Sequence, residues 1–245
     1  MNIEKDKWAV FKQRFVQNLV KGRFTNKMEE LKYYYEEMES KFKIDISELS
    51  KKYDAEVKEA PIDLETKRNI DEYFSEEHQI IEKIYIKLFR YSTLVTIYSL
   101  LETALNGLCD FLKHKMELSL RYDELRGQGI VRAKSYMSKV CYIDFPEDTH
   151  EWQEILKFNY IRNCIVHAEG DIECDSNPTR IRKTINHTKG VELANDRFIM
   201  VDSSYIVSMP SSRSKARITT EKDNSIINNI ERLLDKLYEL SFEKL

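Results

Sequence analysis

The stretch LVTIYSLLETALNGLCDFL, residues 94–112, decides the fold class of this chain. Its apolar residues recur every three or four positions, which is the period of one face of an α-helix. The pattern extends from about residue 75 to residue 116 and includes Ile80, Ile81, Ile84, Leu88, Tyr91, Leu94, Val95, Tyr98, Leu101, Leu105, Leu108 and Leu112. At a rise of ~1.5 Å per residue such a helix would be about 60 Å long, which leaves room for a kink or a break.

The ends and the interruptions of this pattern carry two further predictions. Ser75 is followed by two glutamates, so we expect the helix to begin there, with the serine as its N-cap. Glu102, Asn106 and Asp110 interrupt the apolar stretch, so we expect no membrane span.

The composition is that of a soluble, folded, helical protein. Hydrophobic residues make up 42% of the 245 residues and charged residues 33%, which excludes a disordered chain. Only 6 glycines and 4 prolines are present, which favours long helices over a turn-rich β fold. The first residues lack the apolar core of a signal peptide, so we expect a cytoplasmic protein.

The remaining segments predict a mainly α bundle with a helical extension. Residues 1–60 are expected to form a helical hairpin, with a stop at Gly22, a second start at Thr25-Asn26 and an end at Ala60-Pro61. Helices are then predicted over about residues 130–140, 149–167 and 220–242. A small β-hairpin insertion before the last helix is predicted from short strands over 191–193, 198–201 and 205–207. We divide the chain into an N-terminal helical extension, residues 1–74, and a helical domain, residues 75–245.

One short motif, Arg162-Asn163-Cys164-Ile165-Val166-His167, offers chemistry. Arg162 can hold a phosphate through two parallel hydrogen bonds and offset charge in a pentavalent transition state. His167 lies near a helix C-terminus, where the dipole favours the imidazolium form, and can act as a general acid or base. Asn163 stands one helical turn before His167 and could orient its ring. RNA supplies its own 2′-hydroxyl nucleophile, so a phosphate clamp and an acid/base group can suffice without a metal.

Other features of the sequence leave alternatives open. By spacing alone, Arg162 and His167 also fit a surface salt-bridge pair. Residues 178–217 hold eight basic and three acidic residues, an excess of five positive charges, which fits either a polyanionic partner or a solvated loop. We predict no metal site and no cofactor, because the other histidines are widely separated and the four cysteines are scattered: His78, His114, His150, His187, Cys109, Cys141, Cys164 and Cys174.

The string FNYIRNCIVH, residues 158–167, followed by Gly170, resembles the motif of the HEPN superfamily. The stretch YSLLETALN, residues 98–106, resembles the first core helix of that family. The segments ELRGQGI, residues 124–130, and AKSY, residues 133–136, resemble bacterial members linked to defence or abortive infection. The resemblance covers roughly residues 75–242, and residues 1–74 resemble no family that we can name.

The resemblance implies a helical bundle that forms a homodimer and joins two motifs in one composite cleft. It implies metal-independent RNA cleavage that leaves a 2′,3′-cyclic phosphate and a 5′-hydroxyl. Arg162 would stabilise the phosphate, His167 would transfer protons and Asn163 would be the polar motif position. Glu102 would support Arg162, although it could equally lie at the solvent edge of its apolar stripe. Glu169 stands where toxins paired with a nucleotidyltransferase carry a tyrosine, which separates this chain from them.

Three functional hypotheses follow from this sequence. The first is a metal-independent endoribonuclease of a bacterial toxin or anti-phage defence system, with an antitoxin or another defence protein as a further partner. The second is a non-catalytic RNA- or nucleotide-binding HEPN module that serves as a partner subunit. The third is a helical adaptor, which predicts that Arg162 and His167 are buried in pairs within the chain.

Overall fold

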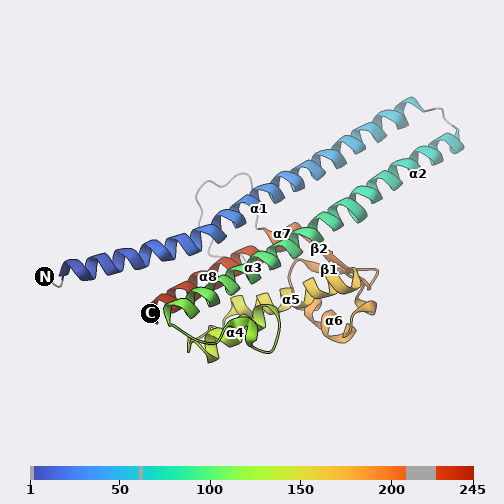
Figure 1. Ribbon diagram of the computed structural model, residues 1–245. Coiled ribbons are helices and arrows are strands. Elements are labelled where there is room, and N and C mark those ends of the chain that lie inside the picture. Colours follow the sequence, from blue (N-terminus) through green and yellow to red (C-terminus); the bar gives the residue numbers. More distant parts are fainter. Residues whose placement is uncertain (1–2, 61–62, 208–224) are drawn as a thin grey trace.

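The computed structural model describes residues 3–60, 63–207 and 225–245, and for residues 3–21 it describes the backbone alone. Helices account for most of this chain, and one two-stranded hairpin precedes the last helix (Figure 1). The prediction of a mainly α bundle with a β-hairpin insertion is therefore confirmed.

The first element, α1, is a single helix of 57 residues, Ile3–Glu59. The predicted stop at Gly22 and the second start at Thr25-Asn26 are wrong, because the helix passes through both positions. A glycine inside a helix costs only about 1 kcal/mol. Packing offsets this cost, since Phe24, Met28 and Tyr35 on the following turns are buried.

The second long helix begins earlier than expected. Asp63 caps α2, Leu64–Ile80, because its carboxylate accepts a hydrogen bond from the Thr66 amide at 2.7 Å. The predicted N-cap at Ser75 is wrong, since this residue lies inside α2. A π-helical stretch, η1, Ile81–Ile86, then joins α2 to α3, Lys87–Lys115, without a break. The suggested boundary between residues 74 and 75 thus falls inside a helix, and the division into two domains stays a prediction.

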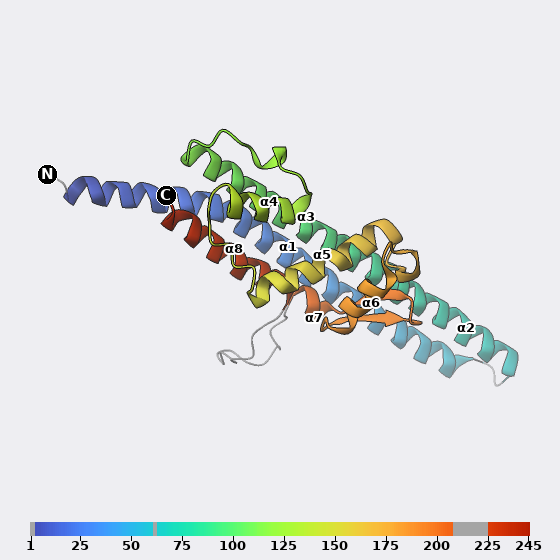
Figure 2. The ribbon, with the colours of Figure 1, turned by 90° about the horizontal axis from the view of Figure 1, so that it is seen from below.

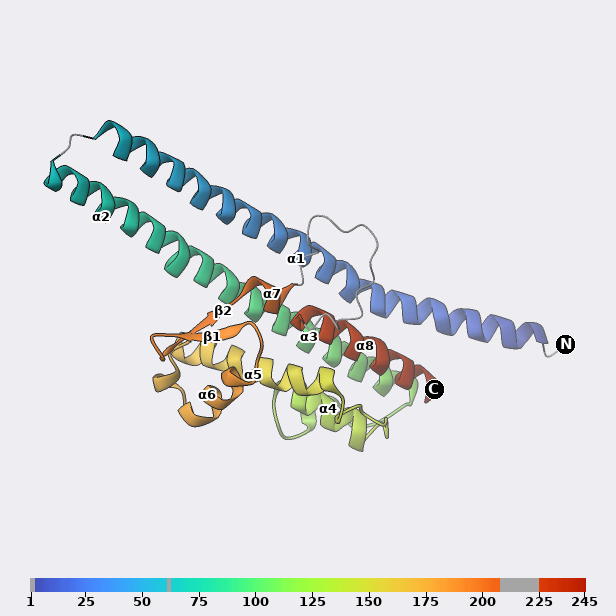
Figure 3. The same ribbon diagram turned by 180° about the vertical axis from the view of Figure 1, so that it is seen from behind.

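The helices form an arm and a bundle. The C-terminal half of α1 lies antiparallel to α2, and together they form a two-helix arm that projects from the rest of the molecule (Figure 1). In the bundle, α3 and α8, Ile226–Glu243, lie between α1 on one side and α4, Gly129–Lys139, and α5, His150–Ala168, on the other (Figure 3). The helical hairpin expected within residues 1–60 is therefore formed by α1 with α2 instead.

The core lies where α3, α5 and α8 meet. Leu101, Leu105 and Leu108 of α3 have no exposed surface. Phe158 and Ile161 of α5 are equally buried. Truncating one such leucine to alanine typically costs 2–5 kcal/mol, roughly, so this cluster fixes how α5 sits on α3.

The segments that follow α5 in the chain, up to the β-hairpin, lie beside its C-terminal end. Figure 2 shows α6, Pro178–Asn186, and the hairpin of β1, Val191–Ala194, and β2, Phe198–Val201, beside that end. The strands pair antiparallel with Val191 opposite Val201, and the turn between them places Asn195 and Asp196 at φ 51° and 56°. Short 3₁₀ turns, η2 and η3, cover Tyr122–Glu124 and Ile172–Cys174.

The predicted third strand over residues 205–207 is wrong. The segment Ser203–Ile206 forms a helical turn, α7, which Asp202 caps through the Ser204 amide at 2.8 Å. Tyr205, Ile206 and Val207 are all buried, so their apolar run reflects burial on every side and not the alternation of a strand. The last helix is confirmed from Ile226, and the earlier part of its predicted range, residues 220–224, lies outside the described residues.

Among the described residues, no helix has a stretch both long enough and apolar enough to cross a bilayer.

Candidate functional site

The helix α5 carries the Arg-His motif and is fixed at both ends. Thr149 caps its start, where the hydroxyl accepts a hydrogen bond from the Trp152 amide. At its end Glu169 adopts the left-handed conformation with φ 54°, and the Gly170 amide donates to the Cys164 carbonyl at 3.2 Å. The inward face of α5 is formed by Trp152, Ile155, Phe158, Ile161, Cys164, Ile165 and Ala168.

Burial of that face leaves the motif's polar residues accessible to solvent. Arg162 and Asn163 are half-buried and His167 is exposed. Asn163 and His167 are one turn apart on the same side of the helix, as the spacing predicted. Cys164 packs inward, and burial raises the pKa of its thiol to about 12, so it is not a thiolate at neutral pH.

Arg162 lies between α5 and α3. Its guanidinium carbon is 4.7 Å from the centre of the Tyr98 ring, a cation–π distance. Its Nη1 donates a hydrogen bond to Asn163 Oδ1 at 3.0 Å. Its Nε is buried and has no hydrogen-bond partner in the part of the chain that the structure describes. Part of the hydrogen-bonding capacity of this guanidinium is therefore unused.

Glu102 and Arg162 both interact with Tyr98 but do not pair with each other. Within the described residues, no salt bridge of 4.0 Å or less joins the two side chains. Burial and the charge of Glu102 raise the pKa of Tyr98, and the charge of Arg162 opposes them, so both groups act on one phenol. A Cβ at Gly129 would lie 2.9 Å from Tyr98 Oη and 3.7 Å from Glu102 Oε1, which places both atoms at the start of α4. Direct support of Arg162 by Glu102 stays a prediction.

His167 is free to meet a ligand. It is exposed, and its imidazole has neither an ion pair nor a hydrogen bond to any residue that the structure describes. The adaptor hypothesis required Arg162 and His167 to be buried in pairs within the chain. The placement of His167 does not fit that requirement.

The loop after His167 is held by a close approach that the sequence analysis missed. The Gly170 carbonyl accepts a hydrogen bond from the Ile199 amide at 2.8 Å, and Tyr91 Oη donates to the Ile199 carbonyl at 2.5 Å. Gly170 has φ +77°, and a Cβ there would lie 2.1 Å from Tyr91 Oη. The sequence contained one sign of this contact, a glycine just after a helix end. Its partner Tyr91 is far away in the sequence, so the contact itself could not be predicted.

A second contact fixes the same loop. The guanidinium of Arg197 binds Asp171 through Nε, at 2.9 Å from both carboxylate oxygens, and through Nη2 at 2.5 Å. These hydrogen bonds lower the pKa of Asp171 to about 2. The charged pair joins the segment after His167 to the β-hairpin, so the exposed histidine sits next to an ordered backbone.

The basic segment over residues 178–217 is partly neutralised within the chain. Arg182 forms ion pairs with Glu173 and Asp196, and Arg197 forms its pair with Asp171. The basic residues Arg213, Lys215 and Arg217 lie outside the described residues. The surplus of positive charge counted in the sequence therefore overstates what this segment presents to a partner.

Arg180 adds a cation beside the motif. Its guanidinium carbon is 3.8 Å from the centre of the Tyr160 ring, and it also donates a hydrogen bond to the Tyr160 hydroxyl. Tyr160, Asn163 and His167 follow one another at intervals of three and four residues, so they share one side of α5. Arg180 of α6 thus adds a guanidinium to the side of α5 that carries Asn163 and His167.

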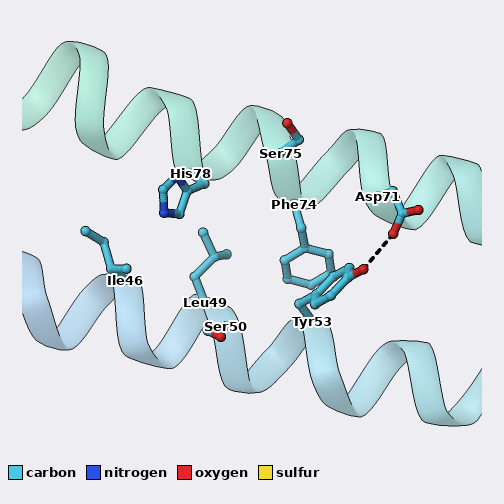
Figure 4. Close-up of a pocket in the computed structure, with 8 residues that line it drawn as sticks. All are labelled: Ile46, Leu49, Ser50, Tyr53, Asp71, Phe74, Ser75 and His78. Atoms are coloured by element: carbon cyan, nitrogen blue, oxygen red, sulfur yellow. Dashed lines mark hydrogen bonds between the residues drawn. The ribbon is translucent and has the colours of Figure 1, made fainter.

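The described residues hold no cluster of three or more histidine, cysteine or acidic side chains that could bind a metal ion. A separate pocket of about 390 Å³ lies in the arm between α1 and α2 (Figure 4). Tyr53 and Phe74 point into it, and the Tyr53 hydroxyl donates to Asp71 at 2.8 Å. None of the motif residues lines this pocket.

Comparisons of this chain with protein-family models, with curated proteins and with solved structures found no match.

Proposed function

We propose that this protein is a metal-independent endoribonuclease of the HEPN type, acting in a bacterial toxin or anti-phage defence system. The observation that carries the proposal is the accessible face of α5. There Arg162 keeps a buried Nε without a partner among the described residues, and His167 is exposed one turn after Asn163. A guanidinium that can hold a phosphate and an imidazole that is free to transfer a proton are two of the groups that RNA cleavage through the 2′-hydroxyl uses.

The chemistry assigns each group a step. A base removes the proton of the 2′-hydroxyl, the 2′-oxygen bonds to phosphorus, and the bond from phosphorus to the 5′-oxygen breaks. An acid gives a proton to the departing 5′-oxygen, which leaves a 2′,3′-cyclic phosphate and a 5′-hydroxyl. Arg162 offsets the charge that develops on the phosphoryl oxygens. His167 serves as base or acid.

Two proton transfers call for two acid/base groups, and each chain offers one histidine in the motif. A homodimer supplies the second. The surface of α3 supports this assembly, because every exposed position between residues 88 and 107 is uncharged: Leu88, Ser92, Thr96, Ser99, Thr103 and Gly107. These positions follow at intervals of three and four residues and form one stripe on the helix that carries Tyr98.

The test is cleavage of total RNA and tRNA in EDTA, with the product ends mapped. His167→Ala and Arg162→Ala should each lower the rate by about 100-fold or more, because they remove an acid/base group and a transition-state clamp. Matched controls are His114→Ala, an exposed histidine in the last turn of α3, and Arg126→Ala, an exposed arginine. The proposal would be overturned if the two control variants were as inactive as the motif variants. It would also be overturned if the His167→Ala protein still produced the RNA fragments.

The second candidate is a non-catalytic RNA- or nucleotide-binding module that acts as a partner subunit. One observation favours it: the guanidinium of Arg162 rests on Tyr98 and its Nη1 is bound by Asn163, so part of the clamp is turned toward the bundle. A dimer that binds RNA and leaves it intact, with binding lost in Arg162→Ala, would select this function over the nuclease.

A further inference from the structure

A pocket of about 550 Å³ lies where the arm meets the β-hairpin, and it contains no residue of the Arg-His motif. Its walls come from α1, from η1 with the start of α3, and from the hairpin β1–β2. Its size falls within the range of roughly 300–1,000 Å³ that is usual for small-molecule sites. The chemistry of the walls indicates what kind of ligand would fit.

The pocket has a surplus of positive charge. Four basic residues and two carboxylates line it. Arg90 and Glu39 neutralise each other, since Nε and Nη2 donate to the two carboxylate oxygens at 2.7 and 2.9 Å. Among the lining residues, Lys43, Lys83 and Lys87 then stand against the single carboxylate of Glu82, an excess of two positive charges. Asp202, which does not line the pocket, interacts with Lys43 and Arg90 and offsets part of this excess.

Within the described residues, none of these three lysines forms an ion pair of 4.0 Å or less. Neither the Lys43 nor the Lys87 ammonium group has an ion pair or a hydrogen bond within the described ranges, and Lys83 donates to the neutral amide oxygen of Gln79 at 2.9 Å. Lys83 and Lys87 are one helical turn apart, so their charges repel each other. A bound anion would relieve this repulsion.

The other walls are apolar. Phe42 is buried on α1, and Ile86, Phe198 and Met200 are half-buried around the pocket. Lys87 lies 5.2 Å from the centre of the Phe198 ring, so charge and aromatic surface adjoin. The exposed amide of Asn195 at the turn of the hairpin adds a group that can both donate and accept hydrogen bonds.

The backbone at this pocket supplies an independent observation. The wall residues Glu82, Lys83 and Ile86 all belong to the π-helical stretch η1. A π-helix is rare, packs its turn less favourably than an α-helix, and is found frequently at functional sites. Its place in the wall of the cationic pocket therefore favours a functional role for this pocket.

We propose that this pocket binds a small organic phosphate of about the size of a mononucleotide. The phosphate lies among Lys43, Lys83 and Lys87, and the flat apolar body lies against Phe198 and Met200. The proposal stands apart from RNA cleavage, because it uses none of the residues assigned to that reaction.

The test is isothermal titration of the full chain with AMP, with adenosine and inorganic phosphate as partial probes. We expect one AMP per chain, weaker binding of both partial probes, and an affinity that falls as salt rises. Lys87→Ala and Lys43→Ala should each weaken AMP binding by about tenfold, because each removes a charge-assisted contact. Lys67→Ala, an exposed lysine of α2 outside the pocket, removes the same charge and should leave binding unchanged. Lys87→Arg keeps the charge and should retain binding, which separates lost charge from lost folding.

Two results would overturn the proposal. The first is the absence of measurable binding for AMP, GMP, CMP and UMP alike, or equal affinity for AMP and adenosine. The second is binding that survives in Lys87→Ala and disappears in Arg162→Ala or His167→Ala, which would place the nucleotide on the α5 face. Neither result depends on whether the protein cleaves RNA.

Discussion

Gly170→Ala is expected to destabilise the protein by about 2–4 kcal/mol, because two separate penalties meet at this position. The backbone has φ +77°, a region where a side chain costs about 1 kcal/mol or more. The new Cβ would lie 2.1 Å from Tyr91 Oη, so the tyrosine must move. Moving it breaks the hydrogen bond to the Ile199 carbonyl and leaves a buried acceptor unsatisfied, which costs about 1–3 kcal/mol.

The assay is thermal and urea unfolding of the variant beside the wild type. For a chain of this size each kcal/mol corresponds to about 2–4 °C in Tm, so we expect a fall of roughly 5–15 °C. Gly22→Ala is the matched control, because a Cβ there would meet nothing within 4 Å and the residue lies inside a helix. That variant should be as stable as the wild type or more stable by up to about 1 kcal/mol.

A double-mutant cycle with Tyr91→Phe tests the mechanism. Removing the hydroxyl relieves the closest contact, although the ring carbons Cε2 and Cζ would still lie 2.9 and 2.8 Å from the new Cβ. The penalty of Gly170→Ala should therefore shrink by about 1 kcal/mol in the Tyr91→Phe background. A penalty below about 1 kcal/mol, or one that does not change in that background, would show that contact with Tyr91 does not cause the destabilisation.

Three further predictions concern other contacts of the fold. The Glu39→Ala substitution should lower the free energy of unfolding, measured in urea, by about 3–5 kcal/mol, because it leaves the partly buried charge of Arg90 without its partner. A loss no larger than that of a surface glutamate variant would contradict this prediction. The pKa of Asp171 is lowered to about 2 in the folded chain, so its pairing with Arg197 stabilises the protein fully above about pH 4. That stability should be lost as pH falls from about 4 to 2, and Arg197→Ala should remove this acid step from the pH profile of Tm. A thiol reagent at pH 8 should label only Cys174 rapidly in the native protein, because the other three cysteines are buried, and mass spectrometry would detect any second labelled site.

Helix content could be predicted where a single face is buried. The spacing of Leu101, Leu105 and Leu108 predicted α3, and their complete burial confirms the interpretation. The ends of the helices could be predicted less well. Asp63, not Ser75, caps α2, because a helix begins where its first free amides find an acceptor, and both residues offer one. The choice depends on the packing of α1 against α2, which local sequence does not contain.

The relative placement of Asn163 and His167 on α5 could be predicted, because the two residues are near in sequence and share a face in any helix. The relation of Glu102 to Arg162 could not, since it depends on how α3 and α5 are placed. The supporting role suggested for Glu102 stays a prediction, and the charges of the two side chains shift the pKa of Tyr98 in opposite directions. The pocket that joins Lys43 to Phe198 had no local signal at all, because its walls come from three separate parts of the chain.

The helical class, the β-hairpin before the last helix and the polar side of α5 could all be predicted from the sequence, since each follows from contacts within a few residues. Three other features became visible in the folded chain: α1 continues through Gly22, Gly170 packs against Tyr91, and three lysines line one pocket. The two groups of features differ in the separation along the chain over which their interactions act. Backbone hydrogen bonds and helix periodicity act over three or four residues, whereas burial and electrostatic pairing act between residues that meet only when the chain has folded.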